Sequence, residues 1–115
     1  MIKQLTLEQL QSRLAANPVI TLLEALPEKY FQDGHLPEAL HMPHDQTRQL
    51  APLLVPNTST EVVVYCASAT CQNSHIAARI LDQIGYGNVS VFAGGKQGWV
   101  EAGLALVPGM QAAAA

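Results

Sequence analysis

Residues 61–81 read EVVVYCASATCQNSHIAARIL, and two hydrophobic patterns meet within this stretch. The run VVVY at 62–65 is β-branched and aromatic without a break, which is typical of a strand buried on both faces of a parallel sheet. From about Asn73 the apolar residues recur at the spacing of one helical face, at Ile76, Ala77, Ile80, Leu81 and Ile84. The stretch therefore predicts a strand that ends at Cys66 and a helix that begins a few residues later.

Cys66 is the candidate nucleophile of this junction. The first turn of a helix has unpaired backbone N–H groups and partial positive charge, which favour a thiolate and predict a lowered pKa for Cys66. The residues after it are mostly small and polar, so the loop can curl and direct successive N–H groups at an anion. The predicted substrate-binding loop consists of Ala67, Ser68, Ala69, Thr70, Cys71, Gln72, Asn73 and Ser74. The structural alternative is a buried, inert cysteine.

Composition limits the classes of function that the chain can have. Its 115 residues are 49% apolar and 13% charged, which predicts an ordered globular protein of one domain. A net charge of −3 argues against a nucleic-acid partner, and the lack of an apolar stretch of roughly 18–20 residues argues against a membrane partner. The N-terminus has no apolar signal core, so we expect a cytoplasmic protein, in which two cysteines indicate chemistry rather than a structural disulfide.

Strand-like and helix-like segments alternate along the chain. Strands are predicted at residues 2–5, 19–23, 39–41, 62–66 and 89–92. Helices are predicted at residues 6–16, 27–33, 45–54, 74–84 and 96–102. This alternation predicts an α/β fold, with a central, mostly parallel sheet of about five strands and helices on both faces.

Single residues add detail to this outline. Thr6 and Gln9 fit a capping box, and Asp45 is the predicted N-cap of the third helix. Tyr30 and Phe31 are predicted core residues. Gly94-Gly95 is expected to let backbone approach the Cys66 loop closely.

Glu24 follows the second predicted strand, at the same kind of strand end as Cys66. Open α/β sheets place ligand-binding groups at the carboxyl ends of their strands. Glu24 is therefore a candidate supporting residue, which would accept hydrogen bonds from loop amides or orient the site. A solvated or helix-capping carboxylate is the structural alternative.

Several motifs, in the expected order, resemble the rhodanese family. They are GHLPEALHMP at 34–43, YC at 65–66, SHIAA at 74–78, GYGNV at 85–89 and GGKQGW at 94–99. The resemblance implies a single-domain rhodanese-like fold over residues 1–107, and residues 108–115 are expected to be a disordered tail. The chain departs from the family at two places, with Glu24-Ala25-Leu26 for the usual D-V-R motif and Cys71 where the commonest loop has an arginine.

The resemblance implies a sulfurtransferase of the thiosulfate sulfurtransferase class. In such an enzyme the Cys66 thiolate takes a sulfane sulfur from a small donor anion, thiosulfate or a persulfide, and becomes a persulfide. It then passes the outer sulfur to a thiol acceptor, either small or on a protein. Loop amides would stabilise the anionic sulfur, and neither a cofactor nor a metal is expected.

Two other functions stay open. Cys66 and Cys71 are five residues apart, near enough for thiol–disulfide or persulfide-resolving chemistry, with Cys71 as a supporting residue or merely a small loop residue. The chain could also be a non-catalytic rhodanese-like binding module, because its loop contains no cation. A metal site at Cys66, Cys71 and His75 is disfavoured, since structural zinc requires four ligands.

Overall fold

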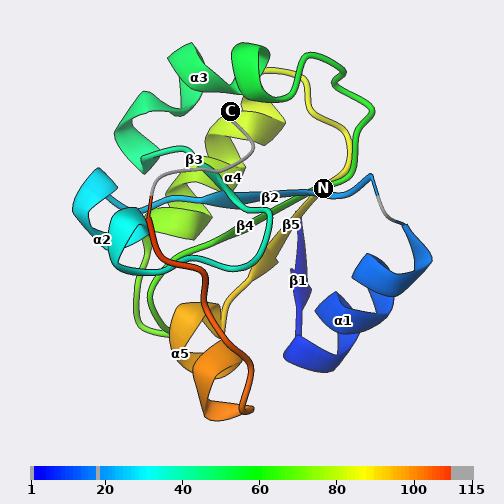
Figure 1. Cartoon of the computed structure of the whole chain (residues 1–115). Helices are drawn as coiled ribbons and strands as arrows, with labels where there is room; N and C mark the ends of the chain where they lie inside the picture. The colour runs from blue at the N-terminus through cyan, green and yellow to red at the C-terminus, as the bar shows by residue number, and fades with distance from the viewer. Residues whose placement is uncertain (1, 18, 110–115) are drawn as a thin grey trace.

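The computed structural model describes residues 2–17 and 19–109, and within them it forms a five-stranded, all-parallel sheet. The strand order is β1-β5-β4-β2-β3 (Figure 1). The strands are β1 (Lys3–Leu5), β2 (Thr21–Glu24), β3 (Leu40–His41), β4 (Val62–Tyr65) and β5 (Val89–Phe92). The predicted α/β class and number of strands are confirmed, and every pairing between the strands is parallel.

Helices cover both faces of the sheet. They are α1 (Leu7–Ala16), α2 (Glu28–Asp33), α3 (Thr47–Leu54), α4 (Asn73–Gln83) and α5 (Gly95–Glu101), with a 3₁₀ helix, η1 (His44–Gln46), before α3. In Figure 1, α3 and α4 lie above the sheet, whereas α1 and α5 lie below it. None of the described helices is both long and apolar enough to cross a membrane.

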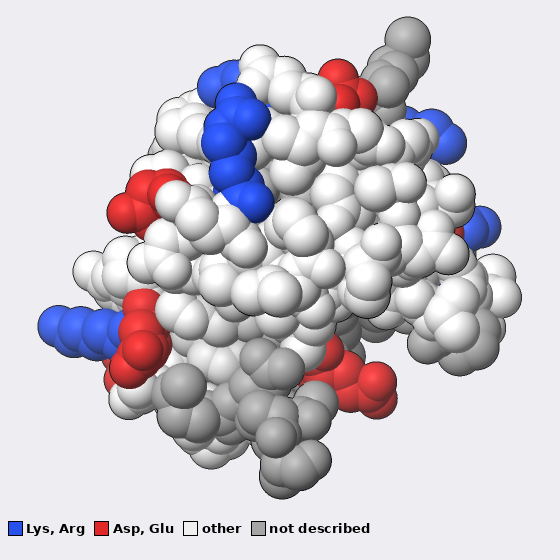
Figure 2. Space-filling view, turned by 90° about the horizontal axis from the view of Figure 1, so that it is seen from above, with Lys and Arg blue, Asp and Glu red and all other residues white. Residues whose placement is uncertain are grey.

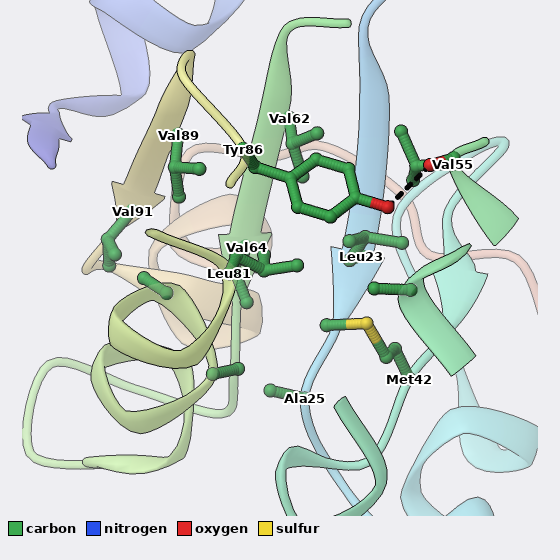
Figure 3. Close-up of a cluster of buried hydrophobic side chains, with 13 residues drawn as sticks. Leu23, Ala25, Met42, Val55, Val62, Val64, Leu81, Tyr86, Val89 and Val91 are labelled. Atoms are coloured by element: carbon green, nitrogen blue, oxygen red, sulfur yellow. Dashed lines mark hydrogen bonds between the residues drawn. The ribbon is translucent and has the colours of Figure 1, made fainter. Parts of the chain in front are cut away.

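The strand β4 is central and buried on both faces, as its uninterrupted apolar run predicts. Val62 and Val64 belong to the core cluster beneath α3 and α4, whereas Val63 and Tyr65 belong to the cluster on the other face. Figure 3 shows the first cluster, in which Tyr86 lies across the side chains and its hydroxyl donates a hydrogen bond to the Val55 carbonyl. Successive side chains of a strand point to opposite faces, so a strand with helices on both sides is apolar throughout.

The strand register brings several segments to one edge of the sheet. Tyr65 pairs with Phe92 on one side and with Glu24 on the other, and Glu24 pairs with His41. These four residues end their strands, so the segments that follow them emerge together at the carboxyl edge. Cys66 follows Tyr65 directly and therefore lies at this edge.

Some local predictions are confirmed and two are wrong. The capping box of Thr6 and Gln9 is present. Phe31 is fully buried, but Tyr30 is 49% exposed, because neighbouring residues on the short helix α2 point in different directions around its axis. Asp45 lies inside η1 and is not an N-cap, because α3 begins only at Thr47 and Gln46 holds its N-cap position. The Thr47 hydroxyl donates a hydrogen bond to the His44 carbonyl across this junction.

The segment that follows α5 returns along the body of the domain. Val107 and His35 form an isolated antiparallel bridge, and the Gly109 N–H donates a hydrogen bond to the Gln32 carbonyl. Residues 110–115 of the predicted disordered tail lie outside the described residues. The first two residues of that predicted tail, 108 and 109, are described.

The surface carries few charges, as the 13% content of charged residues implies. Figure 2 shows the molecule from above relative to Figure 1, and most of this face is uncharged. Side chains of both signs are scattered over it.

Candidate active site

Backbone hydrogen bonds join the loop between β4 and α4 to the start of α5. The N–H of Lys96 donates to the Cys66 carbonyl at 3.0 Å, and the N–H of Gln97 donates to the Ala67 carbonyl at 2.9 Å. A Cβ on Gly95 would lie 2.4 Å from the Cys66 oxygen, and the φ of Gly95 is +61°. The predicted close approach at the glycine pair is confirmed at Gly95, where only glycine fits without displacing backbone.

The sulfur of Cys66 faces the start of α4. The residue is buried, at 1% exposure, and its sulfur lies 3.3 Å from the Ser74 hydroxyl oxygen and 3.4 Å from the Cys71 carbonyl oxygen, either of which can accept its one S–H hydrogen bond. The backbone N–H of Ser74 is also hydrogen-bonded to this sulfur. The sulfur is therefore held by polar groups of the predicted loop, and not enclosed by apolar side chains alone.

Cys71 places a second sulfur in the same loop. Its carbonyl oxygen lies 3.4 Å from the Cys66 sulfur, and interactions with the Cys66 side chain and with the backbone N–H groups of Ala67 and Asn73 act to lower the pKa of Cys71. A turn in which the Cys71 N–H donates to the Ser68 carbonyl at 3.1 Å shapes this part of the loop. The loop thus divides its amide donors between two sulfurs, where the sequence predicted that they would all serve Cys66.

This division changes the acidity that the sequence predicted. Burial raises the pKa of Cys66, the hydrogen bond to Cys71 raises it further, and the hydroxyl and N–H of Ser74 offset only part of this effect. The predicted lowering of the pKa at Cys66 is therefore wrong. Burial also acts to raise the pKa of Cys71, but hydrogen bonds from Cys66, Ala67 and Asn73 outweigh it and lower that pKa. The negative charge of the pair is favoured on Cys71.

The remaining loop residues line the solvent side. Ser68 is half-buried, and its hydroxyl is hydrogen-bonded to that of Thr70 at 3.1 Å. Ala67, Ala69, Thr70 and Gln72 are exposed. Among the described residues, no group of three or more His, Cys, Asp or Glu side chains is placed to hold a metal ion.

Glu24 lies beneath the loop and is fully buried. Its Oε1 accepts a hydrogen bond from the Tyr65 hydroxyl at 2.8 Å, and its Oε2 lies 2.9 Å from Lys96 Nζ. Burial raises the pKa of Glu24, while Lys96 and Tyr65 act to lower it. Glu24 is neither solvated nor a helix cap, and it reaches the Cys66 loop through Lys96, whose backbone N–H holds the Cys66 carbonyl.

Lys96 is a site residue that the sequence patterns do not reveal. Its Nζ also donates to the Tyr30 carbonyl at 2.6 Å, so both ends of this residue are engaged near the loop. A hint in the sequence is its position directly after Gly95, the glycine that contacts the Cys66 backbone. Its carboxylate partner, Glu24, lies far earlier in the chain, so no local sequence pattern pairs the two residues.

Comparisons with known proteins identify similar sequences and folds. A family model described as "Rhodanese-like domain" matches residues 6–102. A rhodanese-like domain from Anabaena sp. is 26% identical, with a TM-score of 0.82 over 97% of this chain and 83% of that chain. No sequence among curated proteins matches significantly.

Two solved structures that are similar to this chain are named as sulfurtransferases. A thiosulfate sulfurtransferase from Pseudomonas aeruginosa is 26% identical, with a TM-score of 0.82 over 96% of this chain, which spans only 21% of that protein. A human single-domain sulfurtransferase shares the fold, with 21% identity and a TM-score of 0.73 over 85% of this chain and 95% of that chain.

Proposed function

The chain belongs to the family of rhodanese-like domains, and from this premise we propose that it is a sulfurtransferase that moves a sulfane sulfur through Cys66. The observation that carries the proposal is the position of the Cys66 sulfur at the carboxyl end of a central strand, hydrogen-bonded to the N–H and the hydroxyl of Ser74. The similarity to an enzyme named as a thiosulfate sulfurtransferase adds support.

The reaction begins with loss of the Cys66 proton, for which the hydrogen-bonded Cys71 sulfur is the acceptor. The Cys66 thiolate then attacks the outer sulfur of the donor, and the S–S bond of the donor breaks. The leaving group is sulfite if the donor is thiosulfate, or a thiolate if the donor is a persulfide. An acceptor thiolate, on a small molecule or a protein, later takes the outer sulfur and regenerates the Cys66 thiolate.

The charge of the loop favours a persulfide as the donor. Residues 66–74 contain no Lys or Arg, so an anion in the loop is met by backbone N–H groups and hydroxyls. Thiosulfate carries two negative charges and gains more from a cation than a persulfide does, which carries one. We therefore propose that thiosulfate loads Cys66 more slowly than a low-molecular-weight persulfide.

Mass spectrometry tests the sulfur-transfer function directly. The protein is incubated with thiosulfate or with a low-molecular-weight persulfide, freed of the donor and weighed intact. We expect added sulfur in wild type that is absent from Cys66→Ser, with the folding of the variant verified by its thermal unfolding. A wild-type protein that gains no sulfur from either donor would contradict the proposal.

A redox function is the second candidate, because the Cys66 sulfur lies 3.4 Å from the carbonyl oxygen of the second free cysteine, Cys71. In that case an oxidant would join Cys66 and Cys71 in a disulfide, and a dithiol would reduce it. Thiol titration after mild oxidation separates the two functions. Rapid loss of both free thiols, in a protein that gains no sulfur from the donors, would favour the redox function.

A further inference from the structure

We propose that Cys71 is a second sulfur carrier, which takes the outer sulfur from the Cys66 persulfide and presents it to the acceptor. This inference rests on the proposed sulfurtransferase function and adds a second transfer within the loop. It assigns a carrier role to a nucleophilic side chain that serves in the first step only as a proton acceptor.

Access to solvent differs between the two sulfurs. Cys66 is 1% exposed, and its backbone is fixed by the Lys96 N–H and by the close approach of Gly95. Cys71 is half-buried, and its chain neighbours Thr70 and Gln72 are exposed. A thiol on a protein acceptor therefore meets Cys71 at the loop surface before it can reach Cys66.

Proximity of Cys71 to the Cys66 sulfur makes the internal transfer direct. The Cys66 sulfur lies 3.4 Å from the Cys71 carbonyl oxygen, and interaction between the two side chains raises the pKa of Cys66 and lowers that of Cys71. A sulfur atom added to Cys66 must extend from this sulfur into the loop. Its outer sulfur is then next to the Cys71 sulfur, as an attack requires.

Each sulfur has its own donors for a negative charge. The N–H and hydroxyl of Ser74 serve Cys66, whereas the N–H groups of Ala67 and Asn73 serve Cys71. A carrier must be an adequate nucleophile in one step and an adequate leaving group in the next. Donors at both positions allow the charge to move from Cys71 to Cys66 as the sulfur moves in the opposite direction.

The step is balanced without an oxidant or a reductant. The Cys71 thiolate attacks the outer sulfur of Cys66–S–SH, the Cys66–S bond to that sulfur breaks, and the products are Cys71–S–SH and the Cys66 thiolate. An acceptor thiolate then takes the outer sulfur from Cys71. Attack on the inner sulfur would instead expel hydrosulfide and leave a Cys66–Cys71 disulfide, which a dithiol reductant would have to reduce before the next turnover.

Localising the added sulfur tests the relay. Wild type, Cys66→Ser and Cys71→Ser are loaded with thiosulfate, freed of the donor, alkylated and analysed by fragmentation mass spectrometry. We expect sulfur on both cysteines in wild type, on neither residue in Cys66→Ser, and on Cys66 alone in Cys71→Ser. Thiosulfate is the suitable donor because it must react at Cys66 before Cys71 can carry sulfur in this scheme.

Other outcomes of this experiment contradict the relay in distinguishable ways. Sulfur on Cys66 alone in wild type would overturn the relay and leave the proposed function intact, whereas sulfur on neither residue, from thiosulfate and from a low-molecular-weight persulfide alike, would overturn both. Loading of Cys71 at the wild-type rate in Cys66→Ser would show that Cys71 reacts with the donor directly, which also overturns the relay. A Cys66–Cys71 disulfide with release of sulfide would mean that the inner sulfur is attacked.

Acceptor size provides a second readout. We expect Cys71→Ser to reduce sulfur transfer to a protein dithiol by about tenfold more than transfer to cyanide, because cyanide is small enough to enter the loop. The ratio of the two rates isolates the relay from the loss of the proton acceptor, which affects both. An unchanged ratio in Cys71→Ser, and in Cys71→Ala as a second variant, would contradict the relay.

Discussion

The ammonium nitrogen of Lys96 lies 2.9 Å from Oε2 of Glu24, a carboxylate that is fully buried beneath the Cys66 loop. Lys96 itself is only slightly exposed, and its backbone N–H holds the carbonyl of Cys66. The pair therefore joins the end of β2 to the start of α5 directly below the site. A buried charge that loses its partner is strongly destabilising, so this contact makes a clear prediction.

Replacing Lys96 with methionine leaves the Glu24 carboxylate buried without its cation. We expect Lys96→Met to lower the free energy of unfolding by about 3–5 kcal/mol at neutral pH, measured by urea denaturation. The loss of Lys96 raises the pKa of Glu24 further above its unfolded-state value, so its protonated form is the one compatible with folding. The deficit relative to wild type should therefore shrink as the pH falls through this raised pKa.

Two further variants check the assignment of this effect. Lys29→Met removes a lysine at an exposed position of α2 and should change stability little. Adding Glu24→Gln to Lys96→Met should recover part of the lost stability, because a neutral amide then replaces the buried carboxylate. If Lys96→Met is as stable as Lys29→Met, the buried ion pair does not have the stabilising role inferred from its geometry.

A methyl group at Gly95 should displace the Cys66 loop. The added Cβ would lie 2.4 Å from the Cys66 carbonyl oxygen, in a residue whose φ of +61° disfavours side chains. We expect Gly95→Ala to be destabilised by roughly 1–3 kcal/mol and to load sulfur more slowly than wild type. Gly87→Ala is the matched control, because a Cβ there meets nothing within 4 Å. Equal loading and stability in the two variants would contradict the proposed contact.

The Cys71 thiol should titrate at lower pH than the Cys66 thiol, although the sequence predicts a lowered pKa for Cys66. The lowered pKa of Cys71 means that its thiolate forms at lower pH than that of Cys66. Initial rates of alkylation, resolved by residue in a mass spectrometer, should therefore rise at lower pH for Cys71 than for Cys66. Restricted access slows the alkylation of Cys66 at every pH, so the comparison uses the pH midpoints of the two reactions and not their absolute rates.

Removing one thiol should also change the acidity of the other. The hydrogen bond to Cys71 is one cause that raises the pKa of Cys66. In Cys71→Ser we therefore expect the pH midpoint of Cys66 alkylation to be lower than in wild type. A midpoint that stays constant or moves upward would mean that the two sulfurs are not coupled in solution.

The Ser74 hydroxyl should assist formation of the Cys66 thiolate. It lies 3.3 Å from the Cys66 sulfur, and its hydrogen bond acts to lower the pKa of Cys66. We expect Ser74→Ala to raise that pKa and to slow sulfur loading by roughly fivefold, equivalent to about 1 kcal/mol for one hydrogen bond. Ser59→Ala, at an exposed position, should load sulfur at the wild-type rate. The same rate in both variants would exclude this role of the hydroxyl.

Local patterns were sufficient to predict the outline of the fold. The apolar run before Cys66 and the helical spacing after it correspond to β4 and α4, because hydrophobic period is a property of neighbouring residues. Tyr30 could not be distinguished from Phe31 in this way, since both are aromatic and only the orientation of α2 on the sheet decides which is buried. The N-cap predicted at Asp45 was wrong for a related reason, because a 3₁₀ turn and an α-helix begin with similar residues.

The amino-acid order by itself determined that a cysteine stands at the end of a central strand, followed by a loop without cations and then a helix. Only the tertiary structure decided how the loop amides are shared between Cys66 and Cys71, and that Lys96 is the partner of Glu24. The periodicities extend over a few residues, whereas acidity and ion pairing depend on burial and on distances between groups that the folded sheet edge brings together.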